Sequence, residues 1–283
     1  MTSTDGLVLV DKPAGLTSHD VVAAVRRATG ARRAGHTGTL DPFATGLLVV
    51  LTGVATRLAR FVPGAPKTYD ATIRFGVRTD TDDATGTPVA SAPLPDESAV
   101  RAAMDRLTGT VLQVPPAYSA KHVGGRRAHA VARSGATVVL DPVPVEVHSW
   151  EVLAHDAETW QVRVTCGSGT YVRALARDLG QLSGSEAHLA ALRRLRIGPF
   201  DVSEAVPVAE VRPETIRPMV GAVPHLPREV VDDAGVAEIR HGRAVPATVT
   251  GERAALVDSR QNLVALADRD GDRWQPRVVL VAA

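Results

Sequence analysis

The chain has 283 residues, of which 45% are hydrophobic and 4% aromatic, and its formal net charge is +1. This length exceeds that of a usual single domain and predicts one large and one small domain. The one cysteine, Cys166, excludes an internal disulfide and a multi-cysteine zinc site, and no apolar run reaches the roughly 20 residues of a membrane span. We expect a cytoplasmic protein without a membrane contact.

The first predicted elements are a strand and a helix. The short apolar run 7–10 is typical of a strand. Thr17 or Ser18 then stands where a hydroxyl can accept from the free amides of a helix N-terminus. A stripe of valines predicts the buried face of this helix, and Gly30 predicts its end.

The stretch from Gly35 to Leu48 holds three glycines, one histidine and one carboxylate. Glycine tolerates unusual backbone angles, so the stretch predicts a shaped loop. Asp41 precedes Pro42, which disfavours the α conformation and places the carboxylate on a turn. The apolar run 47–51 would anchor the loop in a core. A rigid loop that presents one acid suits catalysis, and an ordinary Asp-Pro turn is the alternative.

Basic residues precede this loop, with no acid between them: Arg26, Arg27, Arg32 and Arg33. They suit either a solvated face or contact with phosphates. The chain has only three lysines, and each stands beside a motif: Lys12, Lys67 and Lys121.

The run from Thr68 to Phe75 alternates polar and apolar residues, which predicts a strand with Tyr69 on its inward face. Tyr69 is then either a core side chain or a ring that stacks on a base with its hydroxyl available. The acidic run 79–83 lacks the spacing of a calcium loop, and we interpret it as a solvated turn. Asp96 predicts the cap of a helix that ends at Gly109.

The segment from about 118 to 140 is basic and contains the flexible pair Gly124-Gly125. It predicts a mobile flap that follows phosphates by charge, with a plain exposed loop as the alternative. The runs 145–153 and 159–166 predict neighbouring strands, with Cys166 as a buried apolar residue.

Gly167-Ser168-Gly169 begins like a dinucleotide-binding fingerprint, but Val172 stands where the third glycine belongs. We therefore predict a helix N-terminus capped by Thr170, with amides able to hold an anion, and a helix end at Gly180. Arg173 lies in the first turn of this predicted helix, and an arginine in such a position usually forms a structural salt bridge. A further helix is predicted from Ser185 through Arg196.

Prolines strung through 207–227 predict a domain linker near residue 225. Beyond it, 230–241 predicts a short helix closed by Gly242. Four strand-like runs follow, at 244–249, 254–257, 263–267 and 277–281, and predict a small β-barrel.

Five motifs in order, spread over roughly residues 6–200, resemble the TruB-type tRNA pseudouridine synthases. The most specific is Gly-His-Thr-Gly-x-Leu-Asp-Pro-x-Ala-x-Gly-Leu-Leu, and 35–48 matches every defined position. The resemblance implies an α+β fold with a mixed, mainly antiparallel sheet flanked by helices. It also implies a catalytic domain over 1–224, with an RNA-gripping thumb at about 118–140, and a PUA-like RNA-binding β-barrel over 225–283.

The resemblance implies that Asp41 is catalytic, that Tyr69 lies against the target base and that Arg173 pairs with Asp41. His36 would take the place of the flipped base, and Leu192 would contact the substrate pocket or simply pack in the core. The full set of implied substrate and RNA contacts is His36, Lys12, Arg32, Arg33, Lys67, Tyr118, Lys121, Arg126, Arg127, Leu192, Arg193 and Arg194.

The implied reaction isomerises the uridine at position 55 in the TΨC loop of tRNA to pseudouridine. It is redox-neutral and needs no cofactor or metal. The implied partner is the tRNA TΨC stem-loop, and the protein is expected to act as a monomer without a protein partner. No second acid lies in a motif, which disfavours net glycoside hydrolysis. The alternatives are an RNA-binding or RNA-folding protein without catalysis, and a guide-dependent synthase that acts on other RNA.

Overall fold

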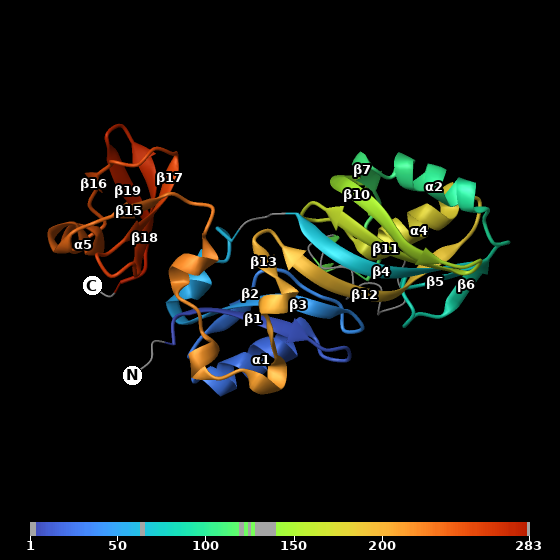
Figure 1. Cartoon of the computed structure of the whole chain (residues 1–283), viewed down its shortest axis with the longest axis horizontal. Coiled ribbons are helices and arrows are strands. Elements are labelled where there is room, and N and C mark those ends of the chain that lie inside the picture. The colour runs from blue at the N-terminus through green and yellow to red at the C-terminus, as the bar shows by residue number, and fades with distance from the viewer. Residues whose placement is uncertain (1–3, 63–65, 119–121, 124–125, 128–139, 282–283) are drawn as a thin grey trace. The chain divides into compact units, whose positions relative to one another are not determined.

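The computed structural model describes residues 4–62, 66–118, 122–123, 126–127 and 140–281. The chain forms two compact units (Figure 1). The first holds 1–42, 46–64 and 199–283, and the second holds 43–45 and 65–198. The sequence boundary near residue 225 stays a prediction. No helix in these described ranges is long and apolar enough to cross a bilayer.

A group of paired strands opens the first unit. Strand β1 (Gly6–Lys12) pairs antiparallel with β3 (Thr45–Thr52) and parallel with the short β14 (Val206–Pro207). Strand β2 (Ala34–His36) pairs antiparallel with β3. The central parts of β1 and β3 are continuous apolar runs because their side chains are buried on both faces.

Helix α1 (Ser18–Thr29) begins as predicted. Thr17 is its N-cap, and Asp20 completes a capping box in which the Thr17 backbone N–H donates to the Asp20 carboxylate at 2.9 Å. Gly30 ends the helix with φ of 69°, a value that favours glycine. The predicted valine stripe packs into a core made of Val8, Val10, Val21, Val25, Leu48, Val50 and Val211.

The end of the first unit contains a five-stranded sheet in the order β15-β17-β18-β19-β16. Its elements are β15 (Arg228–Val230), helix α5 (Asp233–Arg240), β16 (Val245–Pro246), β17 (Arg253–Val257), β18 (Leu263–Asp270) and β19 (Arg273–Val279). The predicted helix and four strand runs are confirmed, and β15 is an addition. Buried Trp274 belongs to the hydrophobic core of this five-stranded sheet, and its indole N–H donates to Glu229 at 2.9 Å.

Short 3₁₀ turns complete the first unit: η1 (Gly53–Leu58), η2 (Val202–Glu204), η3 (Val208–Glu210), η4 (Pro213–Thr215) and η5 (Met219–Ala222). The proline-rich stretch predicted as a linker therefore contains local structure. The two-residue strand β13 (Phe200–Asp201) precedes η2.

The second unit is built on an antiparallel sheet in the order β12-β4-β11-β10-β7. Its strands are β4 (Lys67–Phe75), β7 (Gly109–Gln113), β10 (Val143–His155), β11 (Thr159–Cys166) and β12 (Ala187–Ile197). The alternation predicted for β4 is confirmed, because Tyr69, Ala71, Ile73 and Phe75 are all buried. The fold is thus α+β with a mixed, mainly antiparallel set of strands.

Strand β12 corrects the prediction of a helix over 185–196. It pairs with β4 along its length, and its register shifts between Leu189 and Ala191 and again between Arg194 and Arg196. Each shift adds a residue and breaks the two-residue period of a strand. The leucines then recur at a spacing of three, which imitates a helix.

Helix α4 (Val172–Leu182) packs against β12 and β4, and α2 (Glu97–Arg106) packs against α4 (Figure 1). Two pairs of short strands complete the unit: β5 (Val77–Thr79) with β6 (Pro88–Ser91), and β8 (His122–Val123) with β9 (Arg126–Arg127). Helix α2 ends before the predicted Gly109, which opens β7 instead with φ of 86°.

The ends of α4 also differ from the prediction. Its N-cap is Tyr171, not Thr170, and the helix continues past Gly180 to Leu182. A Cβ atom at Gly180 would lie 2.6 Å from the Ala187 backbone nitrogen. The glycine therefore serves close packing against the start of β12 rather than helix termination.

Candidate functional site

The loop that carries Asp41 is fixed on both sides of this residue. Before it, the backbone N–H of buried Leu40 donates to the Ser18 hydroxyl oxygen at 2.9 Å, and that hydroxyl donates to the Leu40 carbonyl at 3.1 Å. Farther back, the Thr37 N–H donates to the Val49 carbonyl at 3.1 Å. The half-buried Asp41 therefore follows a residue whose two backbone groups are held by the start of α1.

After Asp41, the Pro42 carbonyl accepts from the Lys12 ammonium at 3.2 Å and from the Gly15 N–H at 2.8 Å. Lys12 is fully buried, and its ammonium also donates to the Pro13 carbonyl at 2.9 Å and the Leu16 carbonyl at 2.7 Å. A buried charge requires such partners. Through these contacts Lys12 stabilises the turn that follows Asp41. A direct contact of Lys12 with RNA stays a prediction.

Three other predicted residues of the first unit lie close to this loop in sequence. His36 ends β2, is half-buried, and meets the His19 ring edge to face, with 5.6 Å between ring centroids. Arg32 and Arg33 are exposed just before β2. Their contact with phosphates stays a prediction.

Tyr69 lies in the interior of the second unit with 7% of its surface exposed. Its neighbours across the sheet are Val164 on β11 and Arg194 on β12, and Arg194 is 1% exposed. Lys67, two residues before Tyr69, donates to the Ser168 hydroxyl at 3.0 Å. Burial, followed by the charge of Arg194, lowers the pKa of Lys67. Two cationic groups thus accompany the tyrosine.

Arg193 and Leu192 belong to the same stretch of β12. In the sheet, Arg193 stands opposite Asp70, which accepts two hydrogen bonds from Arg163 on β11, at 2.7 and 3.0 Å. A hollow of about 240 Å³ lies here, lined by Phe43, Thr45, Asp70, Ala71, Thr72, Leu153, Gln161, Ala191, Leu192 and Arg193. Leu192 is 8% exposed, so it both packs in the interior and lines the hollow.

Arg173 is buried at the first turn of α4. Its guanidinium donates to the Thr81 carbonyl at 3.0 Å and to the Tyr118 carbonyl at 2.9 Å, and lies 3.6 Å from the Asp83 carboxylate. Asp41 lies in the first unit and Arg173 in the second. A pair between them stays a prediction.

The acidic run 79–83 is not the solvated turn that we predicted. Thr79, Asp82 and Asp83 expose 4%, 7% and 4% of their surfaces. The arginines of α4 are the charge partners of Asp82 and Asp83 and lie at least 90 residues farther along the chain, a separation over which a sequence pattern gives no signal. Within the run, Asp82 adopts φ of 60°, in the left-handed region.

Arg177 also belongs to this network, although no role was predicted for it. It donates to Asp82 at 3.1 Å, to Asp178 at 2.9 Å and to the Val114 carbonyl at 2.8 Å. Burial raises the pKa of Asp82, while the charges of Arg177 and Arg173 oppose that rise. Burial likewise raises the pKa of Asp178. The signal available in the sequence for Arg177 was its position four residues after Arg173 on the same helix.

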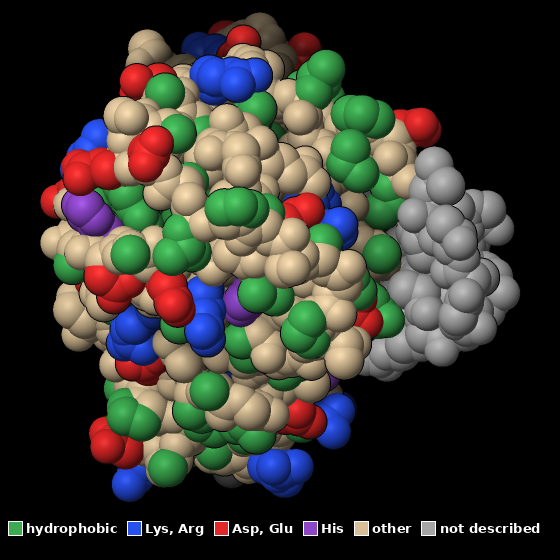
Figure 2. Space-filling view, turned by 90° about the vertical axis from the view of Figure 1, so that its right-hand side faces the viewer, with side chains coloured by type: hydrophobic (Ala, Val, Ile, Leu, Met, Phe, Trp, Pro, Cys, Tyr) green, Lys and Arg blue, Asp and Glu red, His purple; other side chains and the backbone are tan. Residues whose placement is uncertain are grey.

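The predicted basic segment is described only in part. Lys121 lies outside the described residues, and Arg126 and Arg127 form β9, whose side chains are not described. Tyr118 is half-buried, and its carbonyl accepts from Arg173. On the face drawn in Figure 2, basic and acidic side chains are interspersed.

Cys166 is buried, as predicted, and burial raises the pKa of its thiol to about 11. Such a thiol is neutral and unreactive at physiological pH. Within the described ranges, no three side chains among His, Cys, Asp and Glu gather in a way that can hold a metal ion.

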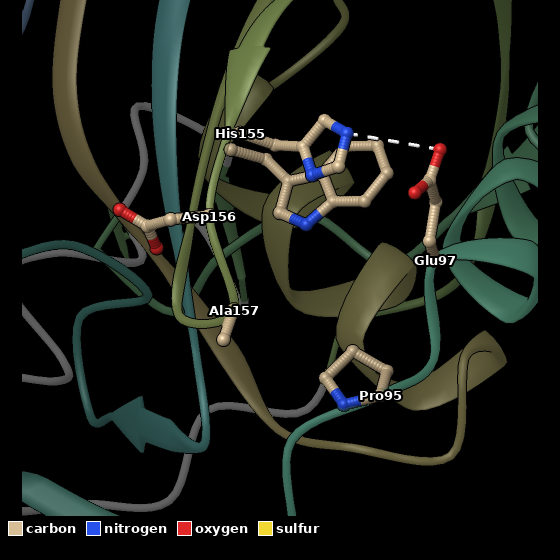
Figure 3. Close-up of a pocket in the computed structure, with 6 residues that line it drawn as sticks. Pro95, Glu97, His155, Asp156 and Ala157 are labelled. Atoms are coloured by element: carbon tan, nitrogen blue, oxygen red, sulfur yellow. Dashed lines mark ion pairs between the residues drawn. The ribbon is translucent and has the colours of Figure 1, made fainter.

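A second hollow, of about 330 Å³, lies at the far end of the β10–β11 hairpin and is lined by Pro95, Glu97, His155, Asp156, Ala157 and Trp160 (Figure 3). The His155 ring stacks on Trp160 with 4.4 Å between centroids, and its Nε2 lies 3.7 Å from Glu97. None of the predicted site residues lines it.

Comparison with known proteins matches most of the chain to one family. The family described as TruB family pseudouridylate synthase (N terminal domain) matches residues 26–172, and the tRNA pseudouridylate synthase B C-terminal domain matches 173–217. Proteins named tRNA pseudouridine synthase B are similar at 44% identity in Thermobifida fusca and 45% in Cutibacterium acnes. Each alignment spans 291 residues and covers 99% of both chains.

Solved structures agree with this result. The chain resembles the structure titled "Structure of H/ACA RNP bound to a substrate RNA containing 2'-deoxyuridine", with a TM-score of 0.74, 25% identity and coverage of 98% of this chain and 86% of the other. It resembles an archaeal box H/ACA Nop10-Cbf5 complex with the same TM-score at 26% identity, covering 99% and 88%. The fold is that of the pseudouridine synthases, and the chain belongs to the TruB family of pseudouridylate synthases.

Proposed function

We propose that this protein isomerises the uridine at position 55 in the TΨC loop of tRNA to pseudouridine, acting as a cytoplasmic monomer without protein partners. The observation that carries the proposal is the complete Gly35–Leu48 motif, whose Asp41 stands between two anchored residues, Leu40 and Pro42. A loop fixed before the substrate arrives is the preorganisation that catalysis requires. Relatives named for this activity, at 40–45% identity, support the choice of tRNA.

The proposed reaction conserves atoms and electrons. The bond from uracil N1 to ribose C1′ breaks, the base turns, and a bond forms from C5 to C1′. The proton on C5 leaves, and N1 gains a proton, so the reaction requires no redox cofactor. Asp41 serves either as a nucleophile at the sugar or as the base that removes the C2′ proton. In both routes Arg173 keeps this carboxylate ionised, and Tyr69 lies against the base.

The target base must leave its stack, at a cost of a few kcal/mol. His36 fills the space that the base leaves, on the same loop as Asp41. The exposed Arg32 and Arg33, together with the basic segment at about 118–140, hold the phosphates of a folded RNA loop. Lys12 contributes by fixing the Pro42 carbonyl next to Asp41.

We also propose a domain boundary near residue 225, with 1–224 as the catalytic domain and 225–283 as a PUA-like RNA-binding module. Its support is the five-stranded sheet β15-β17-β18-β19-β16, which has a core of its own around Trp274. The buried Glu229 ties this core together, because it accepts from Trp274 and from the Thr248 and Val249 amides.

Release of tritium from C5-labelled uridine in tRNA tests the function. We expect the wild-type protein to release tritium from full tRNA and from an isolated TΨC stem-loop, and Asp41→Asn to release none. Glu97→Gln, in the hollow of Figure 3 that none of the predicted site residues lines, is the matched control and should retain full activity.

The outcomes separate the alternatives. Unchanged release by Asp41→Asn would contradict the enzymatic proposal and leave an RNA-binding or RNA-folding protein. Activity that appears only with a guide RNA and added proteins would instead favour a guide-dependent synthase that acts on other RNA.

A further inference from the structure

We infer that Gln113 is a positioning residue that sets the place of Arg173 through the backbone of Tyr171. Gln113 is the last residue of β7, and its side chain is fully buried. A buried primary amide is uncommon because each of its polar groups must find a partner. The inference rests on the proposed function, in which Arg173 takes part in catalysis.

Both polar groups of the Gln113 amide meet a single residue. The Tyr171 N–H donates to Gln113 Oε1 at 2.9 Å, and Gln113 Nε2 donates to the Tyr171 carbonyl at 3.2 Å. The side chain therefore pairs with the backbone of Tyr171 as a neighbouring strand would. Two bonds fix the direction of this peptide as well as its distance, which one bond would not.

Tyr171 is the N-cap of α4, and within the described residues its own side chain makes no capping bond. Arg173 follows two residues later, in the first turn. Because a helix is stiff along its axis, the orientation of its N-cap determines where its first-turn side chains point. The Gln113 pair therefore acts on Arg173 through a very short path of backbone.

The residues after Gln113 strengthen this connection. The carbonyl of Val114 accepts from Arg177 at 2.8 Å, and the carbonyl of Tyr118 accepts from Arg173 at 2.9 Å. Three positions of one segment thus hold the first two turns of α4. Gln113 is the one of the three whose side chain binds the backbone of the helix N-cap, so its replacement removes no bond made by the arginine side chains themselves.

The test is Gln113→Met, which keeps the length and bulk of the side chain but loses both hydrogen bonds. We expect kcat for tRNA to fall about 10- to 100-fold with little change in KM. The reason is that displacing a catalytic group by about 1 Å lowers the rate by up to roughly 100-fold. Val147→Ala, a cavity in the buried part of β10, is the control for lost stability and should keep kcat at a permissive temperature.

Two further measurements distinguish positioning from a structural role. Combined with Arg173→Lys, Gln113→Met should lower the single-turnover rate by less than twofold, because the two changes act through one group. The Tyr171 amide should exchange its hydrogen faster in Gln113→Met than in the wild type, while amides of β18 in the first unit stay unchanged.

Full kcat in folded Gln113→Met would overturn the inference. So would multiplicative losses in the double variant, or an equal fall in kcat for Val147→Ala. Failure of the proposed function has a different signature: the wild-type protein would release no tritium, while the Tyr171 exchange comparison would still report whether the Gln113 pair exists.

Discussion

Two clusters of charged side chains in the second unit use similar groups in opposite surroundings. Around α4, Arg173 and Arg177 meet Asp82, Asp83 and Asp178, and the side chains of the pairs Arg173–Asp83 and Arg177–Asp82 are at most 14% exposed. In the hollow of Figure 3, Glu97 meets Arg101 and His155 with about half of its side chain in solvent. Only the first cluster is tied to the backbone of distant segments.

The difference shows what burial adds to an ion pair. Water screens an exposed pair, and the free energy gained by holding two long side chains together is small. A buried pair has already lost its water, so removing one partner leaves an unpaired charge in the interior. Substitutions in the α4 cluster should therefore change the stability and the geometry of the second unit, whereas substitutions in the exposed cluster should change little beyond the surface charge.

The largest effect is expected from Arg177→Met, which leaves Asp82 without its closest charge. We expect the free energy of unfolding to fall by about 3 kcal/mol at neutral pH, as for other buried pairs that lose one partner. The measurement is urea unfolding followed by circular dichroism.

The pH dependence of this variant has a definite sign. Burial already raises the pKa of Asp82, and loss of Arg177 raises it further. A carboxyl with a raised pKa is most favourable to the folded state below its ordinary pKa, and that advantage is lost as pH rises. The deficit of Arg177→Met should thus shrink between pH 7 and pH 5, and a constant deficit would argue against a buried Asp82 charge.

Adding Asp82→Asn to Arg177→Met should recover part of the lost stability. The amide carries no charge to bury, and asparagine tolerates the positive φ of this position. A double variant less stable than Arg177→Met alone would contradict this account of the cluster.

An intermediate effect concerns Cys166, a neutral buried group in the same unit. Burial raises the pKa of its thiol to about 11. The stability gained from keeping the proton is present below the ordinary thiol pKa and is lost as pH rises through about 11. At pH 8 we expect a thiol reagent to react with the native protein far more slowly than with the urea-unfolded chain. Equal rates would show an exposed thiolate.

The smallest effect is expected in the hollow of Figure 3. Glu97→Gln removes an exposed carboxylate whose pKa is lowered chiefly by the hydrogen bond from Arg101. We expect the thermal unfolding midpoint to remain unchanged within error in 0.15 M salt, where exposed pairs are screened. A clear loss would mean that exposure does not separate the two clusters.

The sequence predicted local structure well where the signal was local. Strand β4 follows from its two-residue period, and α1 follows from the Thr17 cap and Gly30. The prediction of a helix over 185–196 was wrong because two register shifts in β12 give its leucines a helix-like spacing. Only the pairing of β12 with β4 reveals these shifts.

The site was predictable in its motifs but not in its contacts. The Asp41 loop was located from residue types alone, whereas the interior position of Lys12 depends on three carbonyls that converge in space. The acidic run was assigned to solvent because its partners on α4 lie far along the chain. Gln113 gave no signal, since one glutamine in an apolar run has no characteristic pattern.

The division of the chain between the two units has a consequence for its synthesis. Most of the second unit is one continuous stretch, 65–198, whereas the first unit needs residues from both ends. Leu7 exchanges backbone hydrogen bonds with Arg217, at 3.1 and 2.8 Å. At 5–20 residues per second, a ribosome makes Arg217 roughly 10 to 40 s after Leu7. The unit that carries Asp41 is therefore completed last, after the stretch that carries Tyr69 and Arg173 has emerged.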